Sequence, residues 1–193
     1  WTNAYEDGDE VVLEGFHQGD PSPRPDVDDA MWMFRYLALD WMQTRLHRWR
    51  LNLRTGAVTE ERLRDDFTEF GMINGRRTGR RHRYVYAATG VPGWFLFDGI
   101  VRHDVETGRD DVLRLPEGVY GSEVGVAPKV HATAEDDAYL VTFTTDVPND
   151  RSECLIFDAR GVADGPIARL RLPERISSGT HAAWAPGSAL GPS

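Results

Sequence analysis

The chain is poor in cysteine, in long apolar runs and in positive charge. Its single cysteine, Cys154, excludes a disulfide within the 193 residues and fits a reducing compartment, so we expect a cytoplasmic protein. No stretch approaches the roughly 18 apolar residues of a membrane-spanning helix. With 22 Lys and Arg against 31 Asp and Glu, the net charge is −9. This balance argues against nucleic-acid binding, because phosphate recognition needs clustered positive charge.

Positive charge gathers at one place, residues 75–83, where glycines break a run of arginines. We interpret this basic cluster as a solvated loop rather than an anion or RNA site. An initiator Met and a signal peptide are also missing, since the chain begins at Trp1 in a polar stretch. We therefore expect the chain to begin within a longer protein.

Most of the chain is predicted to form β-strands. Short alternating or apolar runs end in turn signals, for example at residues 10–15, 94–99 and 139–144. The pattern favours one helix, at about residues 27–39, because a Pro-rich stretch precedes it, Asp26 is a suitable N-cap and its apolar residues share one face.

A strand-turn unit recurs along the chain. Asn52, Asp104 and Asp158 each precede a turn, with a period of about 53 residues, and each turn is followed by a strand that ends in leucine. A repeat of this length that is nearly all strand is typical of four-stranded propeller blades. The 193 residues would hold three to four blades. An ordinary β-sandwich with accidental spacing is the alternative.

Six histidines are present, but none has the HxH or HxxxH spacing of a local metal motif. His181 differs in its setting, Gly-Thr-His-Ala-Ala-Trp at residues 179–184, where small neighbours allow close approach to a buried centre. This segment resembles the last ligand motif of the carotenoid oxygenase family, Gly-x-His-x-x-Trp after Arg-Leu-Pro. The start of the chain matches too: Asn-Ala-Tyr-Glu at residues 3–6 resembles His-x-x-Asn-Ala-Tyr/Trp-Glu, whose histidine would fall immediately before Trp1.

Two glutamates lie in further segments that resemble this family. Glu69 begins Glu-Phe-Gly-Met-Ile-Asn, which is similar to Glu-Phe-Pro-x-Ile-Asn with Gly71 in place of the usual proline. Glu123 lies in a segment similar to Gly-Glu-Pro-x-Phe-x-Pro-Arg, and Glu-Asp-Asp at residues 135–137 follows as in the family. The second segment departs from the family pattern at Ser122, Val124, Gly125 and Lys129.

The resemblance implies an all-β fold that is an incomplete part, three to four blades, of a seven-bladed propeller. It implies one domain at residues 1–186 and a flexible tail at residues 187–193. Fe(II) would lie on the propeller axis, held by four neutral histidines of which His181 is the fourth. Glu123 would hold the His181 imidazole and Glu69 that of the third histidine, since a ligating imidazole needs a partner for its other nitrogen.

The reaction implied is cleavage of a conjugated C=C bond of a carotenoid or apocarotenoid, a hydrophobic polyene, by O2. Three alternatives stay open: cleavage of a stilbenoid substrate, isomerisation without cleavage, and a non-catalytic propeller that serves as a binding module. The resemblance also allows peripheral membrane contact through the N-terminal half of the longer protein. With one of four ligands, the chain alone is expected to bind little iron and to be inactive.

Overall fold

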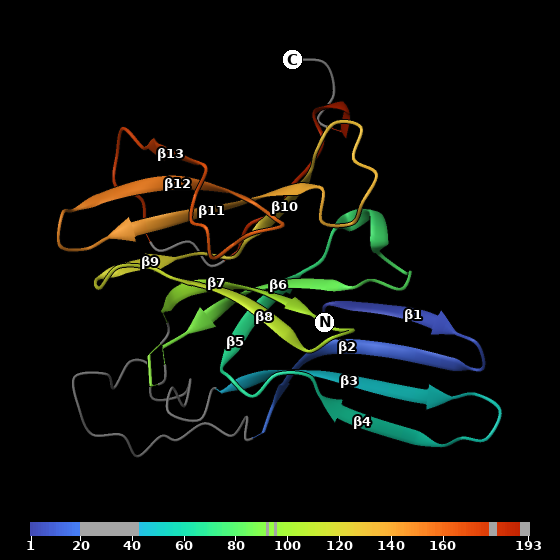
Figure 1. Ribbon diagram of the computed structural model, residues 1–193. Coiled ribbons are helices and arrows are strands. Elements are labelled where there is room, and N and C mark those ends of the chain that lie inside the picture. The colour runs from blue at the N-terminus through green and yellow to red at the C-terminus, as the bar shows by residue number, and fades with distance from the viewer. Residues whose placement is uncertain (20–42, 92, 95, 178–180, 190–193) are drawn as a thin grey trace.

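The computed structural model describes residues 1–19, 43–91, 93–94, 96–177 and 181–189 (Figure 1). The helix predicted at residues 27–39 lies outside the described residues. Within these ranges the regular structure is antiparallel β-sheet apart from two short 3-10 turns, η2 (Gly75–Arg77) and η3 (Gly187–Ala189). The second of these lies in the predicted tail. No helix in the described ranges is long and apolar enough to cross a membrane.

The strands form three successive four-stranded meanders, which we call the first, second and third blade (Figure 1). The first blade contains β1 (Asn3–Asp7), β2 (Glu10–Gln18), β3 (Thr44–Asn52) and β4 (Val58–Arg62). The second contains β5 (Thr68–Met72), β6 (Tyr84–Gly90), β7 (Phe97–Asp104) and β8 (Arg109–Arg114). The third contains β10 (Gly125–Pro128), β11 (Ala138–Asp146), β12 (Arg151–Asp158) and β13 (Ala168–Arg171). A short strand, β9 (Val119–Gly121), pairs with both β7 and β11 and joins the second blade to the third.

The outer hairpin of each blade uses the same turn chemistry. Asn52, Asp104 and Asp158 end the third strand of their blades, and the side-chain oxygen Oδ1 of each accepts a backbone N–H from the turn that follows. Gly56 and Gly108 complete two of these turns with φ of 73° and 71°, a left-handed conformation that suits glycine. After the outer strand, the next backbone N–H bonds back to the third strand, from Leu63, Leu115 and Leu172.

The repeat seen in the sequence is therefore structural, and the prediction of an all-β array of three to four blades is confirmed. The blades meet at two seams, each with its own chemistry. The second seam, between the second and third blades, is apolar and contains fully buried side chains including Tyr86, Ile100, Leu140 and Phe157. The first seam, between the first and second blades, has a smaller apolar cluster formed by Leu46, Ile73, Val85 and Val105.

Charged side chains fill the rest of the first seam. Glu14 of β2 is fully buried, and its Oε1 accepts a hydrogen bond from Nε of Arg48 at 2.8 Å. Its other oxygen lies 2.9 Å from Nε2 of His82, which comes from the second blade. Burial alone would raise the pKa of Glu14, but His82 and Arg48 together hold that pKa below its usual value.

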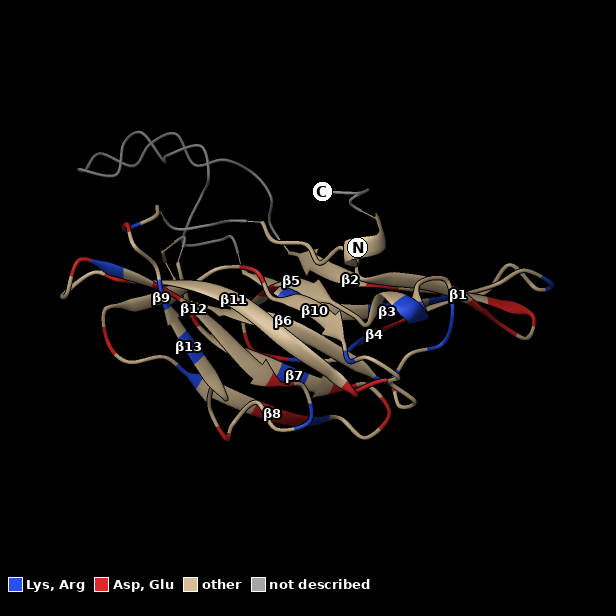
Figure 2. Ribbon diagram, turned by 90° about the horizontal axis from the view of Figure 1, so that it is seen from above, with Lys and Arg blue, Asp and Glu red and all other residues tan. Residues whose placement is uncertain are grey.

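Asn3 extends this network to the basic cluster. Its side-chain amide donates to Nδ1 of His82 at 3.0 Å and to the carbonyl oxygen of Arg80 at 2.9 Å, and its oxygen accepts the N–H of Gly79 at 3.0 Å. The arginines of residues 76–81 are exposed, as predicted for a solvated loop. The bonds from Asn3 nevertheless fix the backbone of that loop to β1. Figure 2 shows that charged residues gather on the turns and outer strands.

Candidate functional site

Glu123 attaches the end of the chain to the third blade. It lies in the loop between β9 and β10, and its side chain is 11% exposed. Its Oε2 atom accepts the backbone N–H of Ala182 at 2.8 Å and lies 3.4 Å from Nδ1 of His181. The segment passes beside β10, since the backbone nitrogen of Trp184 would lie 3.9 Å from a Cβ at Gly125, an ordinary contact distance. The structure thus brings together Glu123 and His181, which are 58 residues apart.

The contact with Glu123 has a chemical consequence for His181. A neutral imidazole carries one proton, and the carboxylate favours that proton on Nδ1. The lone pair of Nε2 is then available to a metal ion, the usual arrangement in which one ring nitrogen ligates and the other is held. The side chain of His181 is 77% exposed, so Nε2 is accessible.

Glu69 lies at the start of β5, where the first and second blades meet. Its Oε2 accepts a hydrogen bond from the hydroxyl of Thr44 at 2.6 Å. Burial raises the pKa of Glu69, while the Thr44 hydroxyl and the backbone N–H of Phe70 oppose that rise. The start of the chain passes beside β5, since the hydroxyl of Thr2 would lie 3.1 Å from a Cβ atom at Gly71.

The ring of Phe70 lies next to the His181 imidazole. The two ring centroids are 5.1 Å apart with an interplanar angle of 73°, an edge-to-face contact. Sequence reasoning missed Phe70 as a site residue, although it follows Glu69 directly in the matched motif. It also missed Thr44, for which the sequence holds no signal, because Thr44 lies 25 residues from the carboxylate that it bonds.

Two other histidines are held by carboxylates, but their surroundings differ from that of His181. Both ring nitrogens of His82 are occupied, since Nδ1 accepts from Asn3 and Nε2 faces Glu14. His103 is 3% exposed and its Nδ1 lies 2.5 Å from Asp110. Burial, with the charge of Arg64, lowers the pKa of His103 to about 4. Both histidines are structural parts of the first seam.

The donor set defines what this chain could contribute to a metal centre. Among residues 1–19, 43–91 and the other described ranges, no group of three or more His, Cys, Asp or Glu side chains could hold a metal ion. His181 can instead supply a single ligand, an imidazole whose Nδ1 is held by Glu123 and whose Nε2 is open. These residues fit an iron centre that takes its other ligands from elsewhere.

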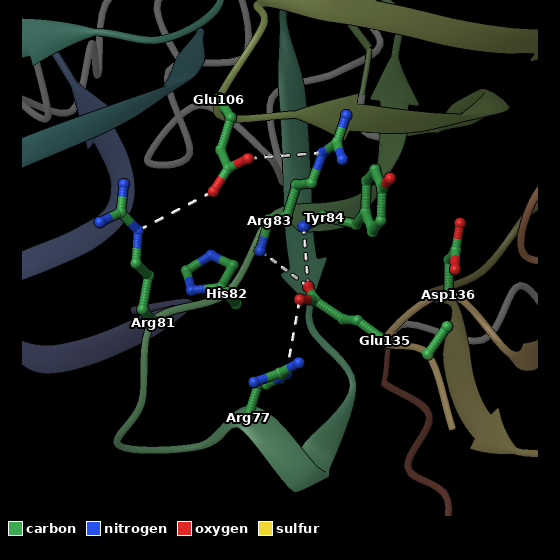
Figure 3. Close-up of a pocket in the computed structure, with 9 residues that line it drawn as sticks. Arg77, Arg81, His82, Arg83, Tyr84, Glu106, Glu135 and Asp136 are labelled. Carbon is green, nitrogen blue, oxygen red and sulfur yellow. Dashed lines mark hydrogen bonds and ion pairs between the residues drawn. The ribbon is translucent and has the colours of Figure 1, made fainter. Parts of the chain in front are cut away.

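A separate pocket of about 430 Å³ lies beside the basic cluster (Figure 3). Its charges are already matched, because Glu106 lies 3.8 Å from Arg81 and 3.7 Å from Arg83. Glu135, the first acid of the Glu-Asp-Asp motif, accepts the backbone N–H groups of Arg83 and Tyr84, each at 2.8 Å. That glutamate therefore fixes the start of β6, and the polar lining does not suit a hydrophobic polyene.

Known proteins resemble the chain over nearly its whole length. The family described as retinal pigment epithelial membrane protein matches residues 1–186. The chain is 32% identical to a carotenoid 9,10(9',10')-cleavage dioxygenase of Crocus sativus, over 93% of the chain and 35% of that protein. It is 34% identical to a carotenoid cleavage oxygenase of Mycobacterium tuberculosis, over 73% of the chain and 29% of that protein.

Solved structures agree with the fold. A mutant of the Synechocystis apocarotenoid oxygenase and an ACO/RPE65 chimera each match with a TM-score of 0.84 and 24% identity, over 95% of this chain and 38% of theirs. The chain therefore spans little more than a third of the length of these proteins. From the family match over residues 1–186, the chain belongs to the retinal pigment epithelial membrane protein family, the carotenoid oxygenases.

Proposed function

We propose that the protein containing this chain is a non-haem Fe(II) dioxygenase, which cleaves a conjugated C=C bond of a carotenoid or apocarotenoid with O2. In this proposal His181 is one of the iron ligands and binds through Nε2. The observation that carries it is the contact of Glu123 with both Nδ1 of His181 and the backbone N–H of Ala182. Glu123 is 11% exposed, so a largely buried carboxylate holds Nδ1 while Nε2 stays open to a ligand.

The relatives support the class of substrate. Three of them, from Crocus sativus, Mycobacterium tuberculosis and Synechocystis, are named for cleavage or oxygenation of carotenoids or apocarotenoids. The chain spans 29 to 37% of their lengths, so the activity proposed is that of the longer protein. The hydrophobic polyene and O2 are its expected partners, and the 193 residues alone are expected to be inactive.

The side chains of this chain have defined roles in the proposal. Glu123 holds the Nδ1 proton of His181, which fixes the tautomer and makes Nε2 a better donor. Glu69 would do the same for the histidine expected immediately before Trp1. When bound, Fe(II) would supply activation of O2. Neutral imidazoles add no charge to the metal, so the two carboxylates also offset part of its positive charge.

Labelled oxygen tests the proposal and separates its alternatives. The full-length protein, loaded with Fe(II), is incubated with an apocarotenal under ¹⁸O2, and the products are examined by mass spectrometry. We expect cleavage to carbonyl products that carry the label. An unlabelled geometric isomer would instead assign an isomerase, and the absence of both iron and turnover would assign a binding module. A parallel incubation with a hydroxylated stilbene decides between the two substrate classes.

A further inference from the structure

We propose that Phe70 is a positioning residue, which fixes the plane of the His181 imidazole by contact between the two rings. This inference rests on the proposed function, because it matters only where His181 ligates a metal. The geometry is the edge-to-face contact described above, with centroids 5.1 Å apart. A second contact of the same kind, also 5.1 Å between centroids, joins Phe70 to Phe97, which is 4% exposed. A continuous stack of rings thus leads from the core to His181.

The backbone of Phe70 is the first argument for a role of its ring. Its φ is 55°, in the left-handed region that bulky residues rarely adopt and that glycine or asparagine would occupy more easily. The residue lies in a β-bulge between Glu69 and Met72, where the register of β5 against β6 shifts. Strained backbone that persists at a bulge points to a functional constraint on the side chain that it carries.

Packing from the first blade keeps the bulge in place. A Cβ atom at Gly71 would lie 2.6 Å from the ring of Phe16, so that ring occupies the space beside the backbone of residue 71. Glu69, on the other side of Phe70, is bonded to Thr44 of the first blade. Phe70 is therefore held between two contacts with the neighbouring blade, and its ring presents a rigid surface to His181.

The contact with Glu123 does not by itself fix the plane of the His181 ring. The short bond of Glu123 goes to the backbone of Ala182, at 2.8 Å, whereas Nδ1 of His181 is 3.4 Å from the same oxygen. One long hydrogen bond restrains the Nδ1 position but allows the ring to turn about it. The edge-to-face contact with Phe70 removes that freedom, because a turned imidazole would lose it.

Substitution in the full-length protein tests the inference. Phe70→Leu removes the aromatic edge, Phe70→Tyr retains it, and Phe70→Gly removes the ring but also relieves the left-handed backbone. Phe157→Leu is the matched control, since it makes the same change in the second seam, outside the ring contact between Phe70 and His181. Each variant is titrated with Co²⁺, and its affinity, the visible ligand-field spectrum of the bound Co²⁺ and the thermal midpoint of the metal-free protein are recorded.

We expect Phe70→Leu and Phe70→Gly to weaken Co²⁺ binding about tenfold, the low end for groups that hold a metal-ligating histidine. Their ligand-field bands should shift, Phe70→Tyr should restore both properties, and Phe157→Leu should lower the midpoint without moving the bands. A thermal midpoint of metal-free Phe70→Gly equal to that of the wild type would show that the substitution leaves the fold stable. Wild-type affinity and spectrum in both Phe70→Leu and Phe70→Gly would overturn the inference.

One further variant separates the inference from the proposed function. If His181→Ala abolishes Co²⁺ binding while the Phe70 variants behave as wild type, the inference fails and the proposed function stands. If His181→Ala binds Co²⁺ as tightly as wild type, the proposed function fails, and the inference fails with it.

Discussion

The two seams between the blades are built from different chemistry. The second seam is a continuous apolar cluster, in which Phe157 and Leu140 are fully buried. The first seam has a smaller apolar cluster and buries Glu14, His82 and His103, whose partners come from both blades. Apolar burial stabilises without regard to direction, whereas buried charges are stable only in the arrangement that pairs them.

The difference matches what each seam adjoins. Asn3 of β1 belongs to the charged network of the first seam, and Glu69 bonds to Thr44 where the same two blades meet. Directional bonds define the position of that strand more closely than an apolar contact could. The second seam carries no candidate ligand of its own and serves as the stable base from which Glu123 reaches His181. We infer that the first seam sets geometry and that the second supplies stability.

The largest effect should come from the apolar seam. Phe157→Ala in the full-length protein is expected to lower the free energy of unfolding by about 4 kcal/mol, because it removes a fully buried ring and leaves a cavity. Phe16→Ala, in the partly buried packing of the first seam, should cost about half as much. Urea denaturation measures both. Equal losses would erase the energetic distinction between the seams.

Acid should act on the first seam before the second. The pKa of His103 is about 4 in the folded protein, below its ordinary value of 6.5, so the unfolded chain takes up the proton first. The stability from neutral His103 is present above pH 6.5 and is lost as pH falls towards 4, by about 3 kcal/mol in all. Hydrogen exchange between pH 7 and pH 4 should show Val85 losing protection earlier than Leu140. His103→Gln should remove most of this difference, and simultaneous loss at both residues would contradict it.

A smaller effect is expected from the buried carboxylate. Glu14→Gln keeps the shape of the side chain but leaves Arg48 and His82 without their charged partner, at a cost of about 2 kcal/mol. Arg48 retains a contact with Glu61 at 3.8 Å, which limits the loss. The matched control is Glu10→Gln, a half-exposed glutamate on the same strand, whose loss should stay below about 1 kcal/mol. Thermal midpoints that fall equally in the two variants would show that the buried network contributes no more stability than an exposed ion pair.

Local chemistry explains which features the sequence could predict. The three outer hairpins followed from Asn52, Asp104 and Asp158, because a side chain that bonds its own turn acts over two or three residues. The spacing of those turns was enough to predict blades. The roles proposed for Glu69, Glu123 and His181 rest on motif resemblance, since nothing local relates residues so far apart.

The features that the sequence did not predict are set by tertiary contacts. The left-handed backbone of Phe70 arises in a bulge that depends on Phe16 and Thr44 of another blade. The basic cluster was predicted as a solvated loop, and its arginines are exposed, but Asn3 fixes its backbone from 77 residues away. Such long-range bonds leave no periodic pattern in the sequence.

Metal analysis of the full-length protein tests the central claim most directly. Purified after loading with Fe(II), the wild-type protein is expected to hold one iron per chain, and His181→Ala is expected to hold none. His17→Ala, which removes an exposed imidazole of β2, should keep the wild-type content. Iron at one per chain in His181→Ala would contradict the assignment of His181 as a ligand.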